Sequence, residues 1–104
     1  MGYQLELRHF TYFLAVAEEL HFRKAAERLY ISQPGLSRQI RQMEEIIGAE
    51  LFVRNKRNVA LTTAGEYLKK ELDFILNHID FTLKQTRLMD AGGEGEIRVG
   101  FLGS

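Results

Sequence analysis

The segment from Ser32 to Gly48 constrains the fold most, because both of its ends specify a helix. Ser32 can act as N-cap, since its hydroxyl can accept a hydrogen bond from a free backbone amide of the first turn. Pro34, the only proline of the chain, lies just inside the start, where its missing N–H costs little. Gly48 can supply the left-handed residue that ends helices. Apolar residues at three- and four-residue steps predict one buried face: Leu36, Ile40, Met43 and Ile47.

Two helices are predicted before this segment. The first runs from Leu7 to Leu20, and the second, shorter one from about Phe22 to Leu29. Ala25 and Ala26 in the second helix are small enough to let another helix approach closely. The first helix has one apolar face, formed by Leu7, Phe10, Phe13, Leu14, Ala17 and Leu20.

The periodicity changes after Gly48. Residues 51–61 place L-F-V-R and V-A-L on either side of N-K-R-N, which predicts a small β-hairpin with a basic tip. Thr63 and Glu66 have the spacing of a capping box and predict a long helix over residues 63–90. Such a helix would be ~40 Å long at about 1.5 Å per residue. A-G-G-E-G then ends it, and one further strand is expected near the C-terminus.

The charge is distributed unevenly, although 14 basic and 14 acidic residues cancel. The stretch from His21 to Asn58 holds eight Lys or Arg against four acids, whereas the stretch from Thr63 to Ser104 holds five against seven. A local cationic patch therefore survives a neutral total.

The chain lacks cysteine, which excludes disulfides and thiolate metal sites, and its three histidines (His9, His21 and His78) lack metal-ligand spacing. We expect neither a metal nor a cofactor.

The predicted location is the cytoplasm, without membrane association. The N-terminus has no signal-peptide pattern, and the longest apolar run, Phe13 to Ala17, is too short to span a bilayer. The absence of cysteine fits a reducing compartment.

Two short helices joined by a tight turn and followed by a hairpin predict a mainly α fold, the winged helix-turn-helix, here continued by a long helix. In this fold the second helix of the pair enters the DNA major groove. Arg can pair bidentately with guanine, Gln can pair with adenine, and Ser can donate or accept. The predicted groove-facing residues are Gln33, Pro34, Ser37, Arg38 and Arg41, and the hairpin residues Arg54, Lys56 and Arg57 would reach the backbone or a minor groove.

Taken alone, neither an exposed helix face with two arginines nor a basic hairpin tip indicates DNA binding, since such surfaces are usually only solvated. The order of the elements is more specific. A small-residue helix, a turn, a capped helix and a basic hairpin follow one another here. That order favours a DNA-binding domain.

The motifs in this order resemble the N-terminal DNA-binding domain of LysR-type transcriptional regulators. The resemblance covers about Leu7 to Leu88 and rests on A-A-x-x-L, S-Q-P, L-S-R-Q-I, E-x-x-x-G, L-F-x-R and L-T-x-A-G. It implies a bacterial transcription factor and not an enzyme. The implied organisation is a winged helix-turn-helix at 1–62, a linker helix for dimerisation at 63–90, and at 91–104 a hinge with the first strand of a truncated effector-binding domain, which G-E-I-R-V-G would open.

The resemblance also implies roles for individual residues. Gln33, Pro34, Ser37 and Arg38 would contact DNA, Arg57 would reach the minor groove, and Arg54 would lie near phosphate. Two positions depart from the family pattern. Gly35 stands where Pro or Ala is frequent, so that the first turn could approach the duplex more closely, and Arg23 stands where Ser or Thr often caps the second helix. Arg41 occupies a variable position and is a candidate for sequence preference.

The long helix has too much apolar surface for one small domain. One stripe comprises Leu68, Leu72, Ile75, Ile79 and Leu83, and can pack on the winged helix. The other comprises Tyr67, Phe74, Phe81 and Leu88, and needs a partner, although an aromatic stripe is more often core. The resemblance implies antiparallel pairing of such helices. We therefore expect a homodimer on an inverted-repeat operator, a tetramer in the full-length protein, and a small-molecule effector only there.

Three alternatives remain open from the sequence. A winged helix of a metal-oxyanion-responsive regulator would also bind DNA, but the G-E-I-R-V-G junction argues against it. A protein-interaction module would use the winged helix only as a scaffold for the long helix. An enzyme has little support, because Ser37 has no evident His partner and no phosphate-binding loop is present.

Overall fold

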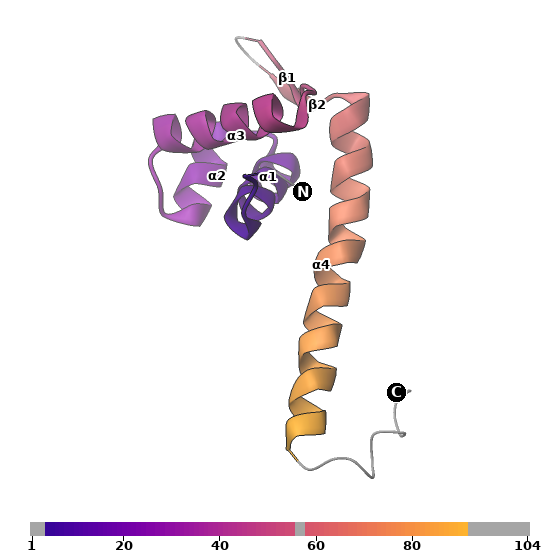
Figure 1. Cartoon of the computed structure of the whole chain (residues 1–104). Helices are drawn as coiled ribbons and strands as arrows, with labels where there is room; N and C mark the ends of the chain where they lie inside the picture. The colour runs from indigo at the N-terminus through magenta and orange to yellow at the C-terminus, as the bar shows by residue number, and fades with distance from the viewer. Residues whose placement is uncertain (1–3, 56–57, 92–104) are drawn as a thin grey trace. The chain divides into compact units, whose positions relative to one another are not determined.

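The computed structural model describes residues 4–55 and 58–91 and confirms the mainly α winged helix-turn-helix with a long final helix (Figure 1). The elements in chain order are α1 (Leu7–Glu19), α2 (Phe22–Leu29), α3 (Gln33–Ile47), β1 (Phe52–Arg54), β2 (Val59–Leu61) and α4 (Thr63–Asp90). The strand predicted near the C-terminus lies outside the described residues.

The chain divides into two compact units, one from Met1 to Leu72 and one from Asp73 onward. The first turns of α4 belong to the first unit, and its later turns to the second. In the first unit, α1, α2 and α3 pack on one another around a core that includes the fully buried Phe13, Leu36 and Phe52. The ring centroids of Phe13 and Phe52 are 5.4 Å apart, so that β1 is joined to the helical core by aromatic contact.

The ends of α3 form as predicted. The Ser32 Oγ accepts a hydrogen bond of 3.0 Å from the Gly35 amide, and Gly48 has the left-handed φ of 85°. Leu36, Ile40 and Met43 are buried, but the prediction that Ile47 belongs to the same buried face is wrong, since its exposed fraction is 39%. Ile47 is the last residue of the helix, beyond the part that faces the core.

The two earlier helices agree with prediction in position, and α2 does so in both bounds. Ala25 and Ala26 are buried, as expected for a close helix contact. In α1, Phe13 and Ala17 are buried, whereas Leu7 and Leu20, at the two ends of the predicted apolar face, are exposed. Leu20 lies past the last turn, with a left-handed φ of 51° as C-cap.

The hairpin pairs β1 with β2 in antiparallel register, with Phe52 opposite Leu61 and Arg54 opposite Val59. Its turn is closed by Asn55, whose side-chain oxygen accepts a hydrogen bond of 2.8 Å from the Asn58 amide. Lys56 and Arg57 lie outside the described residues.

The start of α4 corrects one prediction. The capping hydroxyl belongs to Thr62, not Thr63: Thr62 Oγ1 accepts from the Gly65 amide at 2.9 Å. The same hydroxyl donates to the Glu50 carbonyl at 2.7 Å, a contact that Thr63 cannot make from inside the helix. Thr62 therefore ties the start of α4 to the chain that enters the hairpin.

Candidate DNA-binding surface

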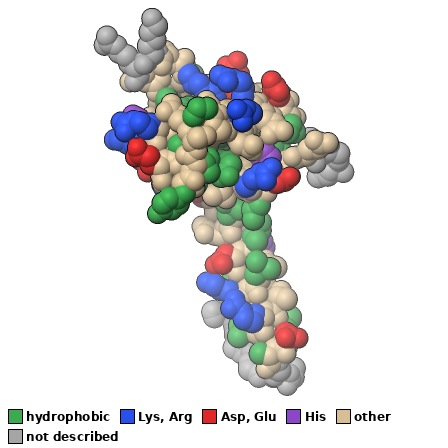
Figure 2. All heavy atoms as spheres, turned by 90° about the vertical axis from the view of Figure 1, so that its left-hand side faces the viewer, with side chains coloured by type: hydrophobic (Ala, Val, Ile, Leu, Met, Phe, Trp, Pro, Cys, Tyr) green, Lys and Arg blue, Asp and Glu red, His purple; other side chains and the backbone are tan. Residues whose placement is uncertain are grey.

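The N-terminal half of α3 carries the residues predicted to contact DNA. Gln33, Pro34, Arg38 and Arg41 are exposed, while Gly35 and Ser37 are partly exposed. Figure 2 shows Lys and Arg side chains gathered at the top of the view, the end of the first unit where Figure 1 places α3 and the hairpin. The structure thus brings all six of these α3 residues to one accessible region.

Arg38 and Arg41 differ from the other arginines of this unit that the structure describes. In the part of the chain that the structure describes, neither has an ion pair or hydrogen bond to a carboxylate. Arg23 instead pairs with Glu27 at 3.5 Å. Two free guanidinium groups on an exposed helix face are available to an anionic partner.

Arg28, unlike Arg38 and Arg41, forms ion pairs with glutamates. It pairs with Glu18 at 2.6 Å and with Glu19 at 3.2 Å. Hydrogen bonding to Glu18 and Glu19 raises the pKa of this guanidinium. Its charge is therefore balanced locally by acids of α1.

A cleft lies on each side of α3. One, the α1–α3 cleft, has a volume of about 320 Å³ and is lined by residues of α1, α3 and the turn before α3: Arg8, Tyr12, Ile31, Gly35, Arg38 and Gln39. The other lies between α2, the start of α3 and the hairpin, and its polar lining includes His21, Arg23, Gln33, Ser37, Arg54 and Asn58.

His21 caps α2, since its Nδ1 accepts from the Lys24 amide at 3.2 Å. The N-cap is therefore provided two positions before the unusual Arg23.

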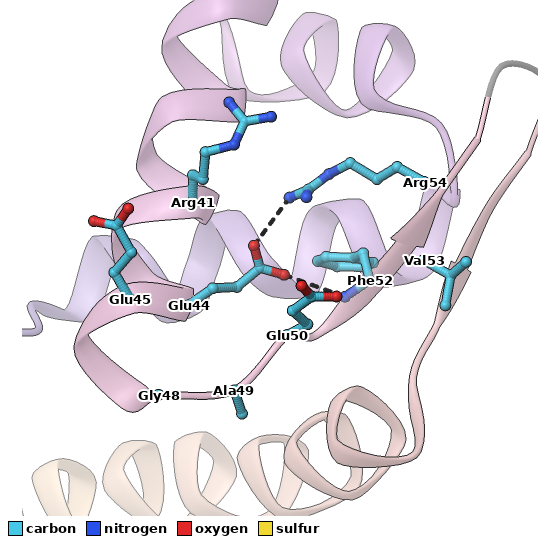
Figure 3. A pocket seen from close by; sticks show the side chains of 9 residues that line it. All are labelled: Arg41, Glu44, Glu45, Gly48, Ala49, Glu50, Phe52, Val53 and Arg54. Carbon is cyan, nitrogen blue, oxygen red and sulfur yellow. Dashed lines mark hydrogen bonds and ion pairs between the residues drawn. The ribbon is translucent and has the colours of Figure 1, made fainter.

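Glu44 connects α3 to the hairpin (Figure 3). This carboxylate is 8% exposed and accepts hydrogen bonds from the backbone amides of Leu51 at 2.8 Å and Phe52 at 3.3 Å. Its second oxygen accepts from Arg54 at 3.3 Å. Figure 3 shows Glu44 turned toward β1, while its neighbour Glu45 points away. Sequence reasoning missed this residue, although the E-x-x-x-G motif contains it.

The Arg54 side chain is held by two groups. Besides Glu44, it contacts the Phe22 ring, whose centroid is 5.2 Å from the guanidinium carbon. Only 28% of the side chain is exposed. Arg54 therefore joins the hairpin to α2 and α3, and its predicted position near a phosphate stays a prediction. Arg57, predicted for the minor groove, lies outside the described residues.

The exposed apolar residues of α4 include all four of the predicted dimerisation stripe. Tyr67, Phe74, Phe81 and Leu88 are each more than half exposed. In the other stripe only Leu68 and Leu72 pack on the core. Ile75, Ile79 and Leu83 of that stripe are exposed.

No group of three or more His, Asp or Glu within residues 4–55 and 58–91 is arranged to hold a metal ion. Over the same residues, no helix is long and apolar enough to cross a membrane.

The fold and this surface define a winged helix-turn-helix of the DNA-binding class. Residues 7–66 match the model of the bacterial regulatory helix-turn-helix proteins of the lysR family, and the chain belongs to this family. The chain is 48% identical over 100 residues to the HTH-type transcriptional regulator YnfL of Escherichia coli, covering 96% of the chain and 34% of that protein. It is 47% identical to AlsR of Bacillus subtilis, with 96% and 33% covered. These relatives are transcriptional regulators, in agreement with the prediction that the chain is not an enzyme.

Solved structures of DNA-binding domains have the same fold as this chain. The DNA-binding domain of BenM in complex with catB site 1 DNA superposes with a TM-score of 0.81 at 40% identity, covering 88% of this chain and 98% of that one. A DNA complex of the CbnR DNA-binding domain gives 0.79 at 34% identity, covering 83% and 99%. The chain spans about a third of the length of the regulators YnfL and AlsR.

Proposed function

We propose that the chain binds duplex DNA with sequence preference, placing the N-terminal half of α3 in the major groove. The observation that carries this proposal is a pair of exposed arginines on α3, Arg38 and Arg41, which have no acid partner among residues 4–55 and 58–91. Arg can contact guanine O6 and N7 bidentately. Support comes from the solved relatives of similar structure that are complexed with DNA.

Each remaining residue of the proposed surface has a task that fits its chemistry. Gln33 can pair with adenine, and Ser37 can donate or accept at a base or phosphate. The side chain of Pro34 is compact and Gly35 has none, so that the backbone of the first turn of α3 can approach the DNA closely. A Cβ at Gly35 would lie 2.8 Å from the Ser32 Oγ and disturb the cap. Arg54 and Arg57 would support the wing on the backbone and in the minor groove.

Arg38→Ala is expected to weaken binding to the operator by about 1–3 kcal/mol while changing binding to scrambled DNA much less, because a bidentate base contact discriminates between sequences. Fluorescence anisotropy with DNA from upstream of the protein's own gene, at two salt concentrations, measures this. Arg28→Ala is the matched control, since Arg28 is already paired with Glu18 and Glu19. Equal losses for Arg38→Ala on operator and scrambled DNA would contradict base contact.

We also propose that α4 pairs with α4 of a second copy. The four exposed residues Tyr67, Phe74, Phe81 and Leu88 recur at seven-residue spacing, as a helix–helix seam requires. Two winged units held in this way would bind an inverted-repeat operator.

Phe74→Asp with Phe81→Asp is expected to convert the dimer to a monomer at micromolar concentration, because two charges would have to be buried in an apolar seam. Sedimentation equilibrium gives the readout. Thr86→Asp adds a charge at an exposed position two residues before Leu88, which points away from the stripe, and should leave the dimer intact. A wild-type monomer under these conditions would disprove the pairing.

In a longer regulator, a C-terminal domain would bind a small-molecule effector and reposition the paired DNA-binding units, acting in the cytoplasm and as a tetramer. This part of the proposal rests on family membership and on the shorter span of this chain relative to its relatives.

A further inference from the structure

The α1–α3 cleft has a basic side chain on each wall and one hydroxyl group, on the α1 wall. Arg8 and Tyr12 are four residues apart on α1, so that they share one face of that helix. Gly35, Arg38 and Gln39 share one face of α3 in the same way. None of the six residues that line the cleft is acidic. The cleft therefore offers two guanidinium groups and a phenol to whatever enters it.

Arg8 is accessible to an incoming anion. Its side chain is 55% exposed, and its only ion pair among the described residues is with Glu6 at 3.2 Å, which is 58% exposed. Exposed pairs of this kind contribute little to stability, because solvent screens both charges. A phosphate, which Arg binds bidentately, can displace Glu6 from the guanidinium.

The position of the cleft relative to α3 indicates which anion it would meet. The major groove is about 12 Å wide and is bordered by one phosphate backbone on each side. A helix that lies in it thus has one backbone along each flank. Arg38, which lies on the recognition face, also lines the α1–α3 cleft. A phosphate of the strand on the α1 flank would therefore lie beside the cleft when Arg38 reaches a base.

We propose that the α1–α3 cleft is a phosphate-binding site for one strand of the duplex, with Arg8 as its principal ligand and the Tyr12 hydroxyl beside it. This inference rests on the proposed function, since it assumes that α3 lies in the major groove. It gives α1, outside the helix-turn-helix itself, a direct role in fixing how α3 lies on DNA. The contact is with the backbone and carries no sequence information.

The test is a salt titration of binding to a mixed-sequence duplex, for wild type, Arg8→Ala, Arg8→Lys and Tyr12→Phe. Loss of one phosphate contact should reduce the slope of log K against log salt by about 0.9 in Arg8→Ala. Arg8→Lys should restore the slope, because a lysine also neutralises a phosphate. Tyr12→Phe should weaken binding severalfold without changing the slope, since it removes a hydroxyl and no charge.

Arg28→Ala removes the same charge elsewhere in the unit and should leave the slope unchanged. An unchanged slope in Arg8→Ala, or the same reduction in Arg28→Ala, overturns the site. Circular dichroism verifies folding, which the exposed Arg8 should not affect. Wild-type binding without sequence preference would contradict the base contact of Arg38 but leave the Arg8 result decisive. A wild type that binds no duplex would overturn both proposals.

Discussion

Glu44→Ala is expected to lower the free energy of unfolding by about 3 kcal/mol, because it leaves buried donors without an acceptor. Glu44 accepts from the amides of Leu51 and Phe52 and from Arg54. Alanine replaces none of these bonds, and the glutamate that makes them is only 8% exposed. At about 4–8 °C per kcal/mol, thermal unfolding should shift far enough to be measured easily by circular dichroism.

Two further variants separate charge from hydrogen bonding. Glu44→Gln keeps an acceptor oxygen for the two amides but loses the charge opposite Arg54, so its destabilisation should be intermediate. Glu45→Ala removes an exposed carboxylate at the adjacent position and should change stability by no more than about 0.5 kcal/mol. Equal effects of Glu44→Ala and Glu45→Ala would mean that the carboxylate of Glu44 does not hold the hairpin.

Gly65→Ala is expected to destabilise the first unit by about 3 kcal/mol, since the new methyl group has no space. A Cβ on Gly65 would lie 2.1 Å from the Leu51 carbonyl oxygen and 2.9 Å from the Leu61 Cδ2. The same Leu51 oxygen accepts a hydrogen bond of 3.0 Å from the Thr62 amide, so it cannot move away without breaking that bond. The helix start and the strand entry would have to separate. Urea unfolding followed by circular dichroism measures the change.

Thr63→Ala provides the control two residues earlier. Thr63 is exposed and its hydroxyl does not cap α4, so the change should stay within about 0.5 kcal/mol. A wild-type midpoint for Gly65→Ala would show that α4 can shift on β1 at little cost.

The sequence predicted those parts of the fold that depend on local chemistry. Ser32 and Gly48 fixed the ends of α3 because caps involve neighbours within a few residues. Thr62 and Thr63 could not be told apart in this way. The bond that selects Thr62 reaches the Glu50 carbonyl, twelve residues away, and only the folded hairpin brings the two together.

The exposure of the candidate α3 residues was predictable from the sequence, whereas the pairing of the arginine charges was not. Composition counts Arg38 and Arg54 alike, yet Arg38 has no acid partner among the described residues whereas Arg54 is paired with Glu44. The pairing spans ten residues and depends on how β1 packs on α3. Arg8 was overlooked for a similar reason, because only the packing of α1 on α3 places it near Arg38.

The helix α4 has an anchored beginning and an unsupported remainder. Of its residues only Gly65 and Leu72 are buried. Residues 73–90 continue the helix without a buried side chain, whereas helices in proteins owe most of their stability to the packing of an apolar face. The folding of this segment is then linked by mass action to the concentration of the partner that covers its apolar face. Dilution should melt these later turns while the winged unit stays folded. The helix content of the later turns would then depend on the protein concentration, whereas that of the first turns would depend on the folding of the winged unit.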